Sequence, residues 1–380
     1  MRQRIVDLLA TSRFANLPTV WSNILVAYLA AWAIGFYAPG QSDAPFNLAA
    51  SFSFQTSPES LFSWTAGLRE ATPWLTLLFL IIPTSCLYLG GCFLNDWKDA
   101  PFDAQHKPAR PIPSGRISKI AVFFLAFFLL TFGLVFSALL SFTAAFLAFG
   151  IILCIVAYTH WHKKTPASFV FMAASRALLY AFGIFALVPF PNFLEFLSFN
   201  FPETLQKSTD GSLSAVSLHL RDHYFSNHSW RALAMPYPLM IGLAAYIFGI
   251  SLFARHESRK KLDGFRPSPA LKLLFFVPLL TAPAVLSHQL NLGQIALALG
   301  PLVIALFLIF HLYAKENNIG NFVSRALANI PLVDATSGLL LIYHLLASEA
   351  LATQQAGFLY LVFFLLSVLA YLLQKIAPAT

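Results

Sequence analysis

The stretch from Asn95 to Gly115, NDWKDAPFDAQHKPARPIPSG, places three aspartates directly after an apolar run. Only 11% of the residues in the chain are charged, so a cluster of acids at this point needs a physical reason. Asn95, Asp99 and Asp103 are four residues apart, which puts their side chains about 40° from one another around a helix axis. We expect these oxygen-bearing side chains to repel one another unless a cation binds among them.

The chain that surrounds this stretch is too apolar for a soluble protein. It has 380 residues, of which 58% are hydrophobic and 39 are phenylalanine, and a soluble domain has no core large enough to bury them. Apolar runs of about 20 residues match the thickness of a bilayer. We predict an all-α polytopic membrane protein with nine to ten transmembrane helices, at about 17–37, 72–94, 119–138, 141–158, 167–189, 234–254, 272–288, 293–313, 327–347 and 356–375.

The distribution of basic residues predicts which side of the membrane each loop faces. With the N-terminus in the cytoplasm, the inner segments hold 19 of the 24 Lys and Arg residues and the outer segments hold four. This asymmetry is the positive-inside pattern. We expect an integral protein of the bacterial inner (plasma) membrane, whose net charge of +8 reflects topology and not nucleic-acid binding.

The polar segments are unevenly distributed between the spans. Two long segments, about 38–71 and 190–233, are predicted to be extracytoplasmic, and two polar inner loops follow the second and sixth spans. That spacing suggests two related halves that contribute one polar loop each to a central cavity. We assign residues 1–350 to the main transmembrane domain and residues 351–380 to an additional C-terminal helix.

The residue types around the aspartates favour a particular ligand. Mg²⁺ in proteins is bound by one or two carboxylates, with phosphate oxygens and water completing its shell. Lys107, Arg110 and Arg116 add positive charge, which a metal alone does not need but a diphosphate does. The combination predicts a site for Mg²⁺ and a diphosphate at the cytoplasmic mouth of an apolar cavity.

Two motifs in this stretch resemble those of a known family. NDWKDAPFD fits the Asn-x-x-x-Asp-x-x-x-Asp motif of the UbiA-type membrane prenyltransferases, and KPARPIPSG is similar to the Arg-Pro-(Ile/Leu)-Pro-Ser-Gly run that follows it. SRFANLPTVWSN, AYTHWHKKTP and ASRALLYAFG also look like that family. The resemblance covers about residues 10–345 without the outer segments.

The resemblance implies an all-helical enzyme that uses Mg²⁺ to ionise an isoprenyl diphosphate, so that a hydrophobic or amphipathic acceptor captures the carbocation within the membrane lipid. Asp99 and Asp103 are then the catalytic residues. The implied metal ligands are Asn95, Asp99, Asp103 and Glu257. The implied diphosphate contacts are Lys107, Arg110, Tyr158, Lys163, Arg255 and Arg259, with Arg13 and Asn23 as weaker assignments.

The sequence departs from the family pattern in two places. The second motif is normally an aspartate pair after the sixth span, but here Glu257 is the acid in that register, and we expect Arg255 or Arg259 to neutralise the diphosphate in place of a second metal. Pro101 lies inside the first motif and is expected to bend or end the helix, so that Asp103 reaches the site from a loop.

Some assignments have alternatives. The ARHE variant of the second motif, with IPLVDATSGLLL, resembles the prenyltransferase-like member of the bacterial Ebo pathway. A non-catalytic isoprenoid-binding protein or carrier is the second hypothesis, and a small-molecule transporter is the third. Arg176 and Asp334 are ionisable groups inside spans, and we expect them to pair with each other. His162 is interpreted as an interfacial histidine.

Overall fold

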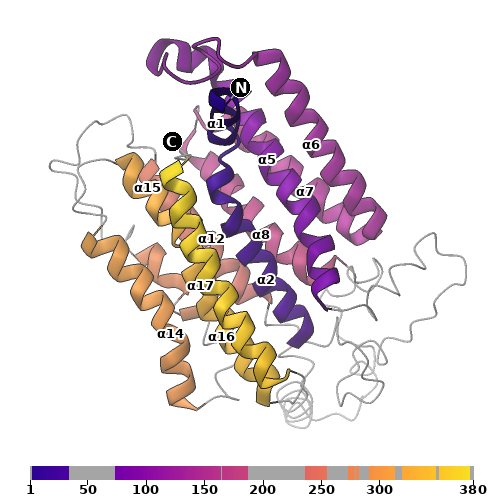
Figure 1. The fold of residues 1–380 in the computed structure, drawn as a ribbon, viewed down its shortest axis with the longest axis vertical. Coiled ribbons are helices and arrows are strands. Elements are labelled where there is room, and N and C mark those ends of the chain that lie inside the picture. The colour runs from indigo at the N-terminus through magenta and orange to yellow at the C-terminus, as the bar shows by residue number, and fades with distance from the viewer. Residues whose placement is uncertain are drawn as a thin grey trace, which may run out of the picture.

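The computed structural model describes residues 2–33, 73–163, 165–186, 236–254, 273–278, 280–281, 291–312, 319–347 and 351–376, and these residues form helices and turns with no strand (Figure 1). Three short helical turns are η1 (Phe14–Asn16), η2 (Pro166–Ser168) and η4 (Leu308–Leu312). The longer helices are α1 (Arg2–Thr11), α2 (Leu17–Ala33), α5 (Pro73–His106), α6 (Lys119–Leu140), α7 (Phe142–Trp161), α8 (Phe169–Phe185), α12 (Pro236–Ala254), α14 (Leu292–Phe307), α15 (Ile319–Ala328), α16 (Ile330–Ala347) and α17 (Thr353–Ile376).

The helices have the length and composition of membrane spans. Within the described ranges, eight helical segments are long and apolar enough to cross a bilayer, and α8 is a further apolar helix of 17 residues. Nine of the ten predicted spans therefore coincide with described helices, while most of the predicted span 272–288 lies outside the described residues. The predicted class, an all-α polytopic membrane protein, is confirmed.

The outward-facing surfaces of these helices are apolar. On α6, Phe124, Phe127 and Phe128 are each more than 60% exposed, whereas the buried residues of the same helix include Ser137 and Gly133. A water-soluble helix would show the opposite pattern. These exposed phenylalanine side chains are suited to contact with lipid chains.

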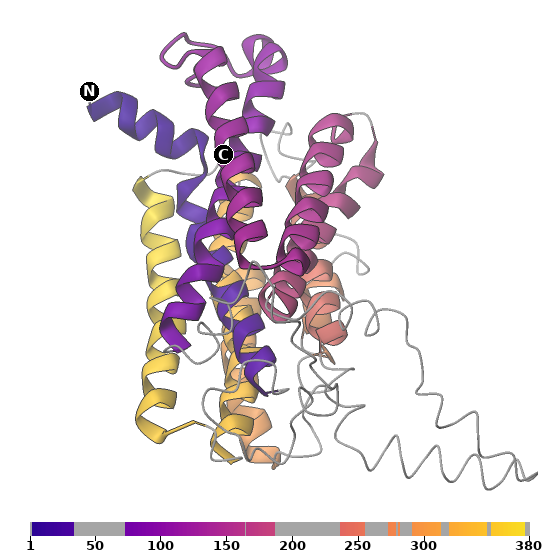
Figure 2. The ribbon, with the colours of Figure 1, turned by 90° about the vertical axis from the view of Figure 1, so that its right-hand side faces the viewer.

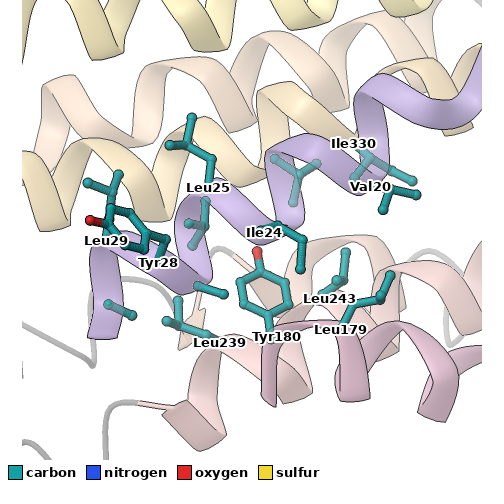
Figure 3. Close-up of a cluster of buried hydrophobic side chains, with 14 of the residues drawn as sticks. Val20, Ile24, Leu25, Tyr28, Leu29, Leu179, Tyr180, Leu239, Leu243 and Ile330 are labelled. Carbon is teal, nitrogen blue, oxygen red and sulfur yellow. The ribbon is translucent and has the colours of Figure 1, made fainter. Parts of the chain in front are cut away.

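Helix α2 lies at the centre of the bundle. It packs against α5, α8, α16 and α17, and nearly all of its side chains are buried. Figure 3 shows how Ile24 and Leu25 of α2 lie among side chains of the neighbouring helices, including Leu179 of α8 and Ile330 of α16. Because α2 is surrounded, a polar side chain on it must find its hydrogen-bond partner on another helix.

Small residues allow close approach at two of these contacts. A Cβ atom added to Gly183 of α8 would lie 2.5 Å from the Cβ of Ala27 on α2, and one added to Gly338 of α16 would lie 2.4 Å from the ring of Phe363 on α17. Van der Waals packing of this kind holds helices together where lipid removes the hydrophobic driving force between them. α8 and α17 are thereby closely packed onto the centre of the bundle.

One end of the bundle gathers segments that are far apart in the sequence. Helix α1, the connection between α5 and α6, and the C-terminal end of α17 all lie at this end (Figure 1), and α1 projects sideways from it (Figure 2). The distribution of basic residues predicts that this end faces the cytoplasm. The Asn95–Gly115 stretch belongs to it, because it forms the last turns of α5 and the connection that follows.

The expectation about Pro101 is wrong. Helix α5 continues through Pro101 to His106, so Asp103 lies on the helix and not on a loop. The proline removes one backbone donor close to the end of a 34-residue helix, and the backbone continues to hydrogen-bond beyond it, as in the bond from Lys107 N to Asp103 O at 2.7 Å. The loss of one bond near a helix end is small compared with the packing of the whole helix.

Candidate functional site

Three oxygen-bearing side chains form a column at the C-terminal end of α5. Asn95 and Asp99 are each 8% exposed and Asp103 is 4% exposed. Their four-residue spacing places them on one face of the helix, and Asn95 Nδ2 donates a hydrogen bond to Asp99 Oδ2 at 3.4 Å. The acids are therefore held inside the protein and do not point into bulk water. We call Asn95, Asp99 and Asp103 the acidic column.

The carboxylate of Asp99 is bound by two basic groups that follow α7. Lys163 Nζ lies 2.8 Å from Asp99 Oδ1, and His162 Nε2 lies 3.2 Å from the same oxygen. The ring of Tyr158, one turn earlier, stacks on His162 with a centroid distance of 5.1 Å. Basic groups near a helix C-terminus are also favoured by the helix dipole. The end of α7 thus brings Lys163, His162 and Tyr158 to the acidic column.

The carboxylate of Asp103 is bound by the segment that follows α5. Arg110 Nη1 donates to Asp103 Oδ2 at 2.7 Å, and the two residues are only seven positions apart. The chain turns back between them through the hydrogen bond from Arg110 N to Lys107 O at 3.0 Å. Gly115, with φ at +76°, adopts the left-handed conformation that glycine tolerates best, and Ser118 then caps α6. The Arg-Pro-Ile-Pro-Ser-Gly run is thus a turn that returns an arginine to the acids.

A further acid, Asp96, faces the junction between α1 and α2. Arg13 Nη2 lies 3.7 Å from Asp96 Oδ1. Arg13 has a left-handed backbone with φ at 50°, which is uncommon for a residue other than glycine and costs about 1 kcal/mol or more. The strained backbone at Arg13, between α1 and α2, thus places the guanidinium beside α5 and next to the acidic column.

The acids near the column each have a basic partner, but two buried oxygen atoms accept no hydrogen bond. Asp96, Asp99 and Asp103 are paired with bases as described above. Asn95 Oδ1 and Asp96 Oδ1 are buried and accept no hydrogen bond from any residue that the structure describes, although Arg13 lies 3.7 Å from the Asp96 oxygen. A buried oxygen without a partner costs free energy. The Asn95 oxygen belongs to the amide that donates to Asp99, so the two residues lie within reach of one cation.

This donor set fits a divalent cation that takes most of its ligands from elsewhere. Within the described part of the chain, no group of three or more His, Cys, Asp or Glu side chains is arranged to hold a metal ion alone. Mg²⁺ commonly uses one or two carboxylates and completes its octahedron with phosphate oxygens and water. The free amide oxygen of Asn95 and the carboxylate of Asp99 fit this mode of binding.

A second polar cluster lies deeper in the bundle, around Asp334 of α16. Its carboxylate is 1% exposed and accepts hydrogen bonds from Asn23 Nδ2 at 2.7 Å, from Tyr180 OH at 2.8 Å and from Ser22 Oγ. Arg176 of α8 donates to Asn23 Oδ1 at 3.1 Å, and its guanidinium lies 5.1 Å from the centroid of the Tyr88 ring on α5. The cluster therefore connects α2, α5, α8 and α16.

The expected pairing of Arg176 with Asp334 is indirect. No direct ion pair joins the two residues in the described structure, and the Asn23 amide lies between them, donating to the acid and accepting from the arginine. Asn23, a weaker assignment for the diphosphate, belongs to this deep cluster and not to the acidic column. An amide can satisfy both charges at once because it is both donor and acceptor.

The predicted site residues divide into three groups. Asn95, Asp99, Asp103, Arg110, Tyr158, Lys163 and Arg13 come together at the C-terminal end of α5, and Lys107 lies in the turn directly after that helix. Asn23 lies deeper. Glu257, Arg255 and Arg259 lie outside the described residues.

Sequence reasoning missed two neighbours of the acidic column. His162 was interpreted as an interfacial histidine, but its position next to Lys163 and four residues after Tyr158 places all three at one end of α7. Asp96 directly follows Asn95 and faces Arg13. In both cases the signal was adjacency to a residue that had already been selected.

Comparison with known proteins shows which family this region is similar to. Residues 59–202 match the model of the UbiA prenyltransferase family. A protoheme IX farnesyltransferase of Bartonella henselae is 29% identical over 216 residues, which are 50% of this chain and 69% of that protein. A digeranylgeranylglyceryl phosphate synthase of Korarchaeum cryptofilum is 39% identical over 89 residues, which are 23% of this chain and 31% of that protein.

The overlap with these relatives is partial. A second protoheme IX farnesyltransferase, from Bartonella tribocorum, is 37% identical over 113 residues, or 35% of its own length. A solved structure of a digeranylgeranylglyceryl phosphate synthase in membranes aligns over 99% of both chains with 13% identity and a TM-score of 0.46. These relatives are prenyltransferases, which transfer alkyl groups larger than methyl. The Ebo-pathway branch stays a prediction.

Proposed function

Because this chain carries a UbiA prenyltransferase family domain, we propose that it transfers an isoprenyl group from an isoprenyl diphosphate to a hydrophobic or amphipathic acceptor in the membrane. The reaction is proposed to depend on Mg²⁺ and to occur at the cytoplasmic face of the bacterial inner membrane, with the N-terminus in the cytoplasm. The support for that orientation is the excess of Lys and Arg in the segments that lie on the same side as the N-terminus.

One observation carries the proposal: a buried column of oxygen ligands is surrounded by basic side chains at one end of a membrane-spanning bundle. Asn95, Asp99 and Asp103 are each less than 10% exposed, and Lys163 and Arg110 lie within 2.8 Å of the two carboxylates. Acids without bases would suit a metal alone, and bases without acids would suit a phosphate alone. Their combination suits a complex of the two.

The residues have distinct roles in the proposed reaction. Asn95 and Asp99 would hold Mg²⁺, with Asp103 as a further ligand, and the ion would supply positive charge to stabilise the departing diphosphate. Lys163 and Arg110 leave their carboxylate partners and bind diphosphate oxygens, and Lys107, Arg13 and Tyr158 are placed to add contacts. The same groups that balance the acids in the free protein then bind the substrate.

The reaction is a substitution at the allylic carbon. The C–O bond breaks, its electron pair leaves with the diphosphate, and the acceptor donates an electron pair to the allylic cation and then loses a proton. Preorganised positive groups stabilise the charge that develops on the leaving group. The surrounding apolar helices exclude water, which would otherwise capture the cation.

The decisive experiment measures diphosphate release and prenylated product. The purified protein in lipid nanodiscs is incubated with labelled C10–C20 allylic diphosphates, Mg²⁺ and an extract that contains acceptors. We expect product with the wild type and a loss of at least about 100-fold in the rate with Asp99→Asn, as for the removal of a group that stabilises the leaving charge.

The matched control is Asp7→Asn. Asp7 is also a buried acid, 5% exposed, and it pairs with Arg116 at 2.9 Å on a different element at the same end of the bundle. We expect this variant to keep most of its activity. Equal activity of wild type and Asp99→Asn would refute the proposed role of the acidic column.

A second function, a non-catalytic isoprenoid carrier, is favoured by a different observation. The second motif of the family is normally an aspartate pair, but this sequence has Glu257 in that register, which leaves fewer carboxylates for the metal that would assist ionisation. In the assay above, tight binding of the diphosphate with no release for any donor or acceptor would support the carrier and not the enzyme.

A further inference from the structure

The C-terminal helix α17 buries a polar residue close to its end. Gln374 is 9% exposed, while its neighbour Leu372 is 48% exposed. A buried amide in an apolar helix costs free energy unless it is hydrogen-bonded. The orientation of this helix, with a glutamine inward and a leucine outward, therefore needs a partner for the glutamine inside the bundle.

The partner is the short turn that precedes α2. Gln374 Nε2 donates a hydrogen bond to Asn16 Oδ1 at 2.6 Å, across 358 positions of sequence. Asn16 is the last residue of η1 and is 2% exposed. One amide thus connects α17 to the α1–α2 junction.

The same turn holds Arg13 in its strained conformation. Asn16 N donates to Arg13 O at 2.9 Å, and Arg13 has φ at 50° while its guanidinium faces Asp96. A left-handed conformation of this kind persists only where the surrounding structure enforces it. The contacts of Asn16 are part of that structure.

The ion pair of Arg13 relates this turn to the acidic column. Arg13 Nη2 lies 3.7 Å from Asp96 Oδ1, and Asp96 directly follows Asn95 on α5. α17 itself packs on α2, α16 and η1. A shift of Gln374 would therefore release the turn that places Arg13 next to the acids.

From these contacts we infer that Gln374 is a positioning residue, and that through Asn16 the C-terminal helix holds Arg13 in place for the diphosphate. The identity of the ligand rests on the proposed function, but the mechanical connection from α17 to Arg13 does not. The helix that the sequence suggested as an addition outside the main domain is then a part of the site.

The test uses Gln374→Met in the full-length protein in nanodiscs, since methionine keeps the length of the side chain and removes the donor. Gln354→Met is the matched control, because Gln354 is a glutamine of the same helix that is exposed. The first readout is the rate of tryptic cleavage after Arg13, followed by mass spectrometry and compared with cleavage elsewhere in the same sample. We expect Gln374→Met to increase this rate about fivefold, the factor that corresponds to one net hydrogen bond, and the control to leave it unchanged.

The second readout is the affinity for inorganic pyrophosphate in the presence of Mg²⁺, measured by isothermal titration calorimetry. Gln374→Met is expected to weaken binding about fivefold in the wild-type background and to have no further effect in an Arg13→Ala background, because the two changes act through the same group. A general loss of structure would weaken binding in both backgrounds. Gln374→Leu, which is similar in volume and also lacks the donor, serves if the methionine variant does not fold.

The outcomes separate the two proposals. If the wild type binds no pyrophosphate, the proposed function fails, while the cleavage rate still decides whether Gln374 holds the junction. Unchanged cleavage after Arg13 in Gln374→Met, or an equal loss of affinity with and without Arg13, would overturn the inference.

Discussion

The deep cluster around Asp334 allows a prediction about stability that is independent of any ligand. Replacement of Asp334 by leucine keeps the approximate volume and removes the acceptor of three hydrogen bonds, from Ser22, Asn23 and Tyr180. Side-chain hydrogen bonds between transmembrane helices contribute on average about 0.6 kcal/mol each and at most about 1.7 kcal/mol. Three such bonds correspond to a loss of about 2–5 kcal/mol in the free energy of unfolding.

The charge of Arg176 gives a second estimate of the loss in the free energy of unfolding, and this estimate is similar. Without Asp334, the buried guanidinium of Arg176 keeps its hydrogen bond to Asn23 but has no compensating negative charge nearby in the cluster. Removal of one partner of a buried pair typically costs about 3–5 kcal/mol. Since both routes count the same lost interaction, the two values are not added.

The assay is a thermodynamic cycle in mixed micelles, with unfolding by SDS followed by tryptophan fluorescence. We expect Asp334→Leu to be strongly destabilised, and the double variant Arg176→Met with Asp334→Leu to recover more than half of the loss, because an apolar pair leaves no unpaired charge. The control is Ser251→Ala. Among the described residues, the hydroxyl of Ser251 bonds to Ile247 O of its own helix at 2.9 Å and to no other helix, so its loss should change stability by less than about 0.5 kcal/mol.

The result that would refute this reasoning is additivity. If the double variant loses the sum of the two single losses, then Asn23 does not couple Arg176 to Asp334. A loss of less than about 1 kcal/mol for Asp334→Leu would contradict the hydrogen-bond count directly.

Two further predictions concern helix packing and the acidic column. Gly183→Ala should destabilise the protein by about 1–3 kcal/mol in the same unfolding assay, because the new Cβ would lie 2.5 Å from the Cβ of Ala27. The control is Gly357→Ala, which should not destabilise the protein because no atom lies within 4 Å of the new Cβ. Equal effects of the two substitutions would contradict the close approach of α2 and α8. Lys163→Met should strengthen the binding of Mg²⁺ alone by removing the cation that lies 2.8 Å from Asp99, and should weaken the binding of Mg²⁺ with pyrophosphate. Calorimetry on both ligands tests this, and two changes of the same sign would be inconsistent with a lysine that moves from the acid to the diphosphate.

The acidic column illustrates what a four-residue spacing predicts. A helix of any protein places Asn95, Asp99 and Asp103 on one face, and the apolar run before them places that face at a membrane boundary. Asp103 shows the limit of the rule. The sequence suggested that Pro101 would move Asp103 onto a loop, but a proline so close to the end of α5 costs one hydrogen bond and leaves the register of the helix intact.

The partners of the column were harder to predict. Arg110 is close to Asp103 in sequence, so a turn was sufficient to join them. His162 and Lys163 are more than 50 positions from Asp99, and Arg13 is more than 80 positions from Asp96. The resemblance to a family supplied Lys163 and Arg13 from their motifs, but for His162 the sequence offered only its adjacency to Lys163.

The sequence by itself determined that this protein consists of membrane-spanning helices and which face of one helix carries the acids. These properties follow from hydrophobicity, spacing and charge, which act over one helix at a time. Only the tertiary structure decided that Asn23 lies between Arg176 and Asp334, and that Gln374 reaches Asn16. Such contacts join residues hundreds of positions apart, and they depend on how each helix is rotated and displaced against its neighbours, which the local sequence pattern does not specify.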